Sequence, residues 1–165
     1  MLVTLPVGWQ LRIFIEPFAG VRMTVAGISA ALGGISSLGT SIVSEFDLAD
    51  AAMAGLTPES ATNLVRSGLL KADELYALVI PRRTLDRRVE AKQSLTVAES
   101  DRLLRAVRVI VRAGDALGST AKAAVWLRTP NAALRGRTPI SMLETDLGAR
   151  MVERTLGRIE QGVHS

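Results

Sequence analysis

Residues 80–118 read IPRRTLDRRVEAKQSLTVAESDRLLRAVRVIVRAGDALG, and this stretch predicts two helices joined by a short turn. The second helix is expected to begin near Val97, because Thr96 and Glu99 have the spacing of a capping box. Beyond this cap, apolar residues recur at helical spacing and predict one buried stripe, made of Leu103, Leu104, Val107, Ile110, Val111 and Leu117. The opposite side carries four arginines, with Val109 lying among them: Arg102, Arg105, Arg108 and Arg112.

The first helix of the pair is expected to start at Pro81. Proline has no backbone N–H, and the N–H at the first helical position has no partner within the helix anyway. Leu85 and Val89 fall on one face and are its two expected apolar anchors. The outer side is basic, with Arg83, Thr84 and Arg87 at its centre and Arg82, Arg88 and Lys92 beside them. Two interpretations stay open at this point, a solvated face or a surface for a polyanion.

The segment before this basic helix favours the second interpretation. Lys71–Leu78 (KADELYAL) predicts another helix, and Val79–Ile80 leaves only a tight turn before Pro81. Two helices joined by a tight turn, with arginines facing outward on the second, have the layout of a helix-turn-helix, whose second helix enters the major groove of DNA. Many such units carry glycine in the turn, and here the position is taken by Val79.

Composition limits the remaining possibilities. At 165 residues, 48% of them hydrophobic, the chain is long enough for one domain with a substantial core, or one domain with an appendage. A net charge of +4 favours polyanionic partners. The absence of cysteine excludes disulfides, thiolate metal sites and cysteine nucleophiles, and it fits a cytoplasmic protein. With a single histidine, His164, we expect no catalytic residues, no metal site, no cofactor and no enzymatic activity.

Residues 1–44 differ from the rest of the chain. Apolar residues alternate at Leu11, Ile13 and Ile15, which indicates a short extended segment, and residues 23–44 carry no charge. Glycines and serines make this run too weakly apolar for a membrane span, no basic region precedes it as in a signal peptide, and no GKS or GKT follows as in a phosphate loop. We expect a poorly ordered or extended Gly/Ser-rich leader, in which Met23 is an alternative start.

The rest of the chain predicts an all-α body. Helices are expected from Phe46 to Gly55 and from Thr57 to Arg66, then, after Gly118, a helix capped by Ser119 or Thr120 that runs to Arg128. Further helices are expected from Thr138-Pro139 to Leu143 and from Thr145 to Gly162. The resulting division is a leader (1–44), a helix-turn-helix domain (45–117) and a C-terminal domain (118–165).

The C-terminal domain contains a more specific pattern than periodicity: W-L, then P-N-x-A-L-x-G-x-T-P, L-x-T, G-A and L-G-R-I-x-x-G. The pattern begins at Trp126-Leu127 and ends at Gly162. It resembles the C-terminal toxin-binding domain of the Xre/MbcA/ParS antitoxins, and IPRRTLDRR and AESDRLLRAVRV resemble the Xre-type DNA-binding half of the same family. Arg135 departs from the pattern, because relatives often have a second glycine there.

The resemblance implies a type II antitoxin. Such proteins bind and neutralise a RES-domain toxin, which consumes NAD, and repress their own operon through the DNA-binding half. It supports base contacts by Arg83, Thr84 and Arg87 and phosphate contacts by Arg82, Arg88 and Lys92, in a homodimer that reads operator half-sites. The candidate toxin-binding residues are polar groups near the end of the chain, where a tail could occlude the toxin's active site: Arg154, Arg158, Glu160, His164 and Ser165.

Other residues of the C-terminal pattern are expected to serve the fold. The apolar ones predict core packing: Trp126, Leu127, Leu134, Leu143, Val152 and Leu156. Pro130, Gly136 and Gly148 are expected to shape the backbone. Two alternatives to an antitoxin remain, a stand-alone helix-turn-helix regulator without a toxin and an interaction scaffold that never meets DNA. The neighbouring gene tests the first alternative, and a salt-dependent mobility shift tests the second.

Overall fold

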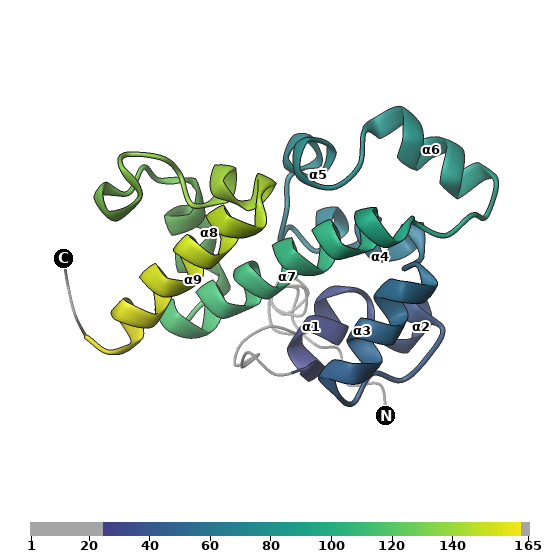
Figure 1. Cartoon of the computed structure of the whole chain (residues 1–165), viewed down its shortest axis with the longest axis horizontal. Helices are drawn as coiled ribbons and strands as arrows, with labels where there is room; N and C mark the ends of the chain where they lie inside the picture. The colour runs from purple at the N-terminus through teal and green to yellow at the C-terminus, as the bar shows by residue number, and fades with distance from the viewer. Residues whose placement is uncertain (1–24, 163–165) are drawn as a thin grey trace, which may run out of the picture.

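A computed structural model describes residues 25–162, and in this part of the chain every regular element is a helix (Figure 1). The α-helices are α1 (Val25–Ala31), α2 (Gly34–Leu38), α3 (Glu45–Ala54), α4 (Pro58–Arg66), α5 (Ala72–Leu78), α6 (Arg82–Glu90), α7 (Val97–Leu117), α8 (Thr120–Arg128) and α9 (Asp146–Glu160). Between α8 and α9 lie two 3-10 helices, η2 (Ala132–Leu134) and η3 (Ile140–Glu144). The predicted all-α fold is confirmed.

Helix α7 is the centre of the molecule. Figure 1 shows α1 to α6 gathered around its N-terminal part and α8 and α9 beside its C-terminal part. The predicted stripe is buried or half-buried, and Leu103 and Val107 have no solvent exposure. Val109, expected among the arginines of an outer face, is also fully buried. Helices pack on more than one side of α7, so the helix has no wide solvated face around Val109.

The predicted capping box begins α7, and it also anchors α6. The Glu99 amide donates to Thr96 Oγ1 (3.2 Å), and the Thr96 amide donates to Glu99 Oε2 (2.7 Å). The same carboxylate pairs with Arg88, whose Nε lies 3.1 Å from Glu99 Oε2. A second nitrogen of Arg88 donates to the Ser94 carbonyl (3.0 Å). The guanidinium therefore ties the end of α6 to the start of α7.

This arrangement corrects two expectations about α6. Arg88 was expected on the outer basic side, but its side chain is only 8% exposed. Val89 was expected to be an anchor, but it is 42% exposed. Leu85, which is buried as predicted, has helical neighbours at both i+3 and i+4. The Glu99 carboxylate attracts the i+3 residue, so Arg88 takes the buried place and Val89 turns to solvent.

Residues 25–44 also differ from expectation, because they are not a poorly ordered or extended leader. They form α1 and α2, and Ile28, Ala31 and Leu32 are buried against the body. The Asn63 side-chain amide donates to the Ala31 carbonyl (3.0 Å). Two of the glycines that suggested disorder instead flank the short helix α2, with Gly33 at its N-cap (φ 101°) and Gly39 at its C-cap (φ 71°).

The predicted extended segment at Leu11, Ile13 and Ile15, and Met23, lie outside the described residues. Within residues 25–162, no helix has both the length and the apolar character needed to cross a membrane.

The C-terminal helices pack closely at Gly148. Thr145 caps α9 by accepting from the Gly148 amide (3.1 Å). A Cβ atom added at Gly148 would lie 2.0 Å from the Met142 carbonyl oxygen, so the first turn of α9 rests directly on the backbone of η3. The apolar residues predicted to form the core here are buried, apart from the half-buried Trp126.

We predict that Gly148→Ala lowers the free energy of unfolding by about 3 kcal/mol, because the new methyl group overlaps backbone that cannot yield without separating α9 from η3. Gly157→Ala is the matched control. Its Cβ would meet only a terminal nitrogen of Arg112 at 3.2 Å, and alanine favours the helix by about 0.5–1 kcal/mol. Urea denaturation measures both variants. Equal stability of the two would show that the close approach at Gly148 is wrong.

We also predict an acid-sensitive contribution from Glu99. Burial, the largest single effect, raises the pKa of Glu99, but hydrogen bonds from Thr96 and Arg88 and the charge of Arg88 together bring the pKa below its ordinary value of 4.5. Because the folded-state pKa is the lower one, the stabilisation is present above pH 4.5 and is lost as the pH falls through the folded-state value.

The measurement is the free energy of unfolding of Glu99→Gln and of the parent protein at several pH values. At pH 7 the substitution should cost about 2 kcal/mol, since it weakens charge-assisted hydrogen bonds to a buried guanidinium. The difference should shrink as the pH drops below the ordinary pKa. Glu90→Gln, on the exposed end of α6, should change little at any pH. A pH-independent loss for Glu99→Gln would contradict the role of its charge.

Candidate functional site

The first candidate site is formed by α5, the turn after it and α6. Val79 and Ile80 are buried (1% and 0% exposed), and their amides both donate to the Leu75 carbonyl, at 3.0 and 3.3 Å. Arg102 of α7 donates to the Val79 carbonyl (3.3 Å) from the other side. Val79 has a φ of −116°, so this turn does not need the positive φ that favours glycine. The turn fixes the start of α6, where Pro81 is the N-cap.

The outer surface of α6 brings most of the expected cationic residues together. Arg82, Arg83, Arg87 and Lys92 are exposed, and Thr84 is half-buried between them. Arg82 lies 3.7 Å from Asp86, but both side chains are mostly in solvent, so this pair binds weakly. We call Arg82, Arg83, Thr84, Arg87 and Lys92 the α6 cationic face. Arg88 does not belong to it, because its guanidinium is buried against Glu99.

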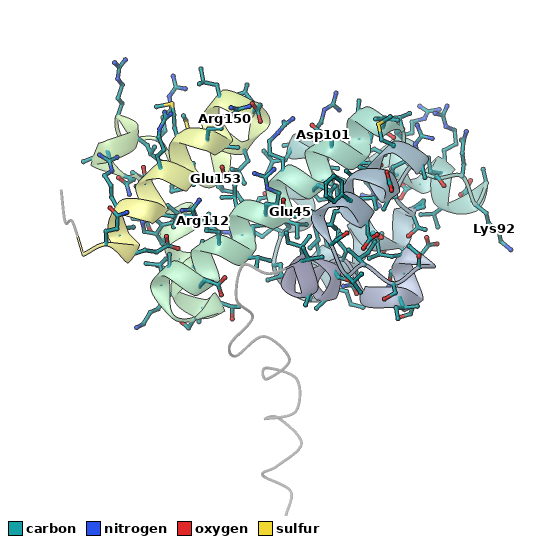
Figure 2. The ribbon with its side chains drawn as sticks, turned by 60° about the horizontal axis from the view of Figure 1, so that its bottom comes forward. Glu45, Lys92, Asp101, Arg112, Arg150 and Glu153 are labelled. Carbon is teal, nitrogen blue, oxygen red and sulfur yellow. The ribbon has the colours of Figure 1, made fainter. Side chains whose placement is uncertain are left out.

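Lys92 stands just beyond α6 in an unusual backbone conformation. Its φ is 50°, in the left-handed region where an L side chain costs about 1–2 kcal/mol. Figure 2 shows its side chain at the far edge of the molecule. A glycine would adopt this conformation without strain. The chain instead places a positive charge there, at the end of the α6 cationic face.

The second candidate site is the outer surface of α9. Arg154 and Arg158 are exposed one turn apart, and Leu147, which is 67% exposed, lies on the same strip by helical spacing. Glu160, expected beside them, turns back toward α7, where Arg112 lies 3.3 Å from its carboxylate. His164 and Ser165 are outside the described residues. Sequence reasoning missed Leu147, although an apolar residue off the Gly148–Val152–Leu156 stripe was a usable signal.

An ion pair connects α8, in the C-terminal half, to α5, the helix that precedes α6. Arg128 of α8 makes two bonds to Glu74 of α5, with Nε 2.7 Å from one carboxylate oxygen and a terminal nitrogen 2.6 Å from the other. Glu74 also accepts from the Lys71 amide (2.8 Å) at the start of α5, where a carboxylate is favoured by the helix dipole. No local pattern predicts its pairing with Arg128, which lies far away along the chain.

Within residues 25–162, no group of three His, Cys, Asp or Glu side chains is placed to hold a metal ion. The connector between α8 and α9 instead contains a second strained basic residue. Arg135 has a φ of 56°, and Gly136 follows with a φ of 76°. Glycine relieves such strain, which accounts for a second glycine at this position in the family pattern.

Two family models match this chain, one over each candidate site. The Antitoxin Xre-like helix-turn-helix domain matches residues 47–108, which hold α5, the turn and α6. The Antitoxin Xre/MbcA/ParS C-terminal toxin-binding domain matches residues 112–162, which hold α8 and α9. The two matched regions meet inside α7.

Individual relatives give the same result. The chain is 36% identical over 121 residues to a protein named Antitoxin Xre from Pseudomonas putida, a match that covers 73% of this chain and 76% of the relative. It is 44% and 42% identical over 96 residues to proteins of the same name from Yersinia enterocolitica and Photorhabdus laumondii, covering 58% of this chain and 65% of each relative. Their identity and the two matched domains show that this chain belongs to the Xre family of antitoxins.

Proposed function

We propose that this antitoxin neutralises a RES-domain toxin that consumes NAD, and that it represses its own operon in the cytoplasm by binding operator DNA. The supporting observation is that two exposed basic surfaces lie near opposite ends of α7, the α6 cationic face and the strip of Arg154 and Arg158 on α9. Neither surface contains an arrangement of residues for chemistry. Each is suited to a partner, and the chain acts without a cofactor by occupying DNA and toxin.

On the DNA side, α6 is the recognition helix. Arg83 and Arg87 lie one turn apart on its exposed side, and an arginine can bind the O6 and N7 atoms of guanine through two hydrogen bonds. Thr84 lies between them and reads a neighbouring base edge. Arg82 and Lys92, at the two ends of the helix, contact phosphates and fix its register. Arg88 serves this surface indirectly, because its pair with Glu99 sets the position of α6.

On the toxin side, Arg154 and Arg158 contact acidic groups of the toxin, and Leu147 supplies an apolar contact on the same strip. The residues that follow α9, ending with His164 and Ser165, enter the NAD pocket and exclude the substrate. Glu160 contributes only after it leaves Arg112, a half-exposed pair whose loss costs little. The match of residues 112–162 to a toxin-binding domain favours an antitoxin over a regulator that binds DNA alone.

We predict that replacing both Arg83 and Arg87 by alanine lowers affinity for the DNA upstream of the gene at least about 30-fold, because each specific arginine contributes roughly 1–3 kcal/mol. Lys92→Ala should weaken binding to all sequences alike and reduce the slope of log K against log salt by about 0.9, as expected for one lost phosphate contact. Mobility shifts at several salt concentrations measure both effects.

Arg154→Ala is the control for this experiment, since it removes one exposed arginine at the other end of α7 and should leave operator binding unchanged. If the double variant of α6 binds the operator with full affinity and an unchanged salt slope, α6 is not the recognition helix.

We predict that deleting Gly162–Ser165 restores NAD consumption by the toxin in a mixture with the antitoxin, while the two proteins still form a complex through α9. The Arg83/Arg87 double alanine variant is the control and should neutralise the toxin fully. The measurement is NAD loss in the presence of the product of the adjacent gene, together with gel filtration of the mixture. Full neutralisation by the truncated chain would rule out occlusion by the tail.

A further inference from the structure

Arginine side chains hold the unit formed by α5, the turn and α6 at its start, its middle and its end. At the end of α6, Arg88 pairs with the first turn of α7. At the turn, Arg102 of α7 donates to the Val79 carbonyl (3.3 Å). At the start of α5, Arg128 of α8 binds both carboxylate oxygens of Glu74, at 2.7 and 2.6 Å.

These contacts come from different matched domains. Arg88 and Arg102 lie within residues 47–108, the region matched by the helix-turn-helix domain. Arg128 lies within residues 112–162, the region matched by the toxin-binding domain. The unit that presents α6 is therefore completed by a side chain from the other domain.

The pair between Arg128 and Glu74 restrains the two helices and not only the two side chains. Its bidentate geometry fixes the orientation of the partners as well as their distance. Arg128 is held on its own helix, because its third nitrogen donates to the Ala124 carbonyl (3.0 Å). Glu74 is held on α5, because its carboxylate accepts from the Lys71 amide (2.8 Å). A movement of α8 relative to α5 must therefore break or distort the pair.

Helix α5 depends on such contacts for its position. It has seven residues, of which Leu75 and Leu78 are buried, and a helix this short is placed mainly by tertiary contacts. It also contacts η3, and Figure 1 shows it between α6 and the C-terminal helices. The turn after α5 is closed by two amides that donate to the Leu75 carbonyl. A change in the orientation of α5 is therefore passed on to the start of α6.

We propose that Arg128 is a positioning residue for operator recognition, and that its pair with Glu74 sets the orientation of α5 and thereby of α6. This inference rests on the proposed DNA-binding role of α6. Arg128 itself does not contact DNA. It acts on the base contacts, because a bidentate bond from arginine to guanine requires an exact placement of the helix. Contacts to phosphates depend mainly on charge and tolerate a small displacement.

The first test compares Arg128→Gln with the parent chain on two duplexes of equal length, the DNA upstream of the gene and an unrelated sequence. We expect affinity for the upstream DNA to fall about 10-fold, a usual size for coupling through one ion pair. Affinity for the unrelated duplex should not change, so the ratio of the two affinities falls by the same factor. Arg128→Lys keeps the charge but not the bidentate geometry, and should lose about 3-fold.

Two further variants separate the pair from a general loss of charge. Arg112→Gln is the matched control, because it also removes an arginine that pairs with a carboxylate, Glu160 of α9, without a link to α5. Its affinity ratio should equal that of the parent. Glu74→Gln should reproduce Arg128→Gln, and the double variant should lose no more than either single one, since both substitutions remove the same pair.

Amide hydrogen exchange of the free chain gives a readout that needs no DNA. Arg128→Gln should raise the exchange rates of residues 72–90, which span α5 and α6, and leave those of residues 146–160 in α9 unchanged. Unchanged exchange in residues 72–90 would overturn the proposal.

The DNA measurements overturn the proposal in two further ways. An equal fall for both duplexes would mean that the variant merely contains less folded protein, and undiminished affinity for the upstream DNA would mean that α6 is placed without the pair. In both cases the parent still binds the upstream DNA, so the proposed function stands. A parent chain that does not distinguish the two duplexes would instead refute recognition by α6, and the role of Arg128 with it.

Discussion

Helix α7 packs against helices from both halves of the protein, and the rest of the structure depends on that shared packing. Its side chains are buried on more than one side, as the fully buried Val107 and Val109 show. Its arginines are used as links, with Arg108 paired to Glu153 of α9 and Arg102 bound to the Val79 carbonyl in the turn before α6. The two matched family regions, residues 47–108 and 112–162, both extend into this helix. A continuous buried helix of 21 residues leaves little freedom between them.

The Arg128–Glu74 pair closes a second connection between the same halves. It is bidentate and mostly shielded from solvent, with side chains 21% and 13% exposed. Removing one partner would therefore leave the other charge poorly solvated and without a counter-ion. It joins α8, within the matched toxin-binding domain, to α5, within the matched helix-turn-helix domain. The two domains are therefore held together by this pair as well as by α7.

The sequence predicted those features whose causes are local. The caps at Thr57, Thr96, Ser119 and Thr145 were all recognisable, because a hydroxyl and an amide three residues apart decide them. The burial of Arg88 in place of Val89 was not, since the choice between i+3 and i+4 depends on Glu99 in another helix. Helices α1 and α2 were missed for a related reason. Their glycine content is unfavourable by itself, and packing of Ile28 and Leu32 on the body stabilises them.

The overall positive charge could not locate the binding surfaces, because many of the arginines hold the fold together. Arg88, Arg108, Arg112 and Arg128 are engaged with acidic partners inside the chain. The backbone distinguishes a different class of basic residue. Among residues 25–162, the non-glycine residues with positive φ are Lys92 and Arg135, and each tolerates strain that a glycine would avoid. Lys92 ends the α6 cationic face, and Arg135 is exposed in the connector of the toxin-binding domain. The local backbone conformation therefore does not account for the basic side chain at either position.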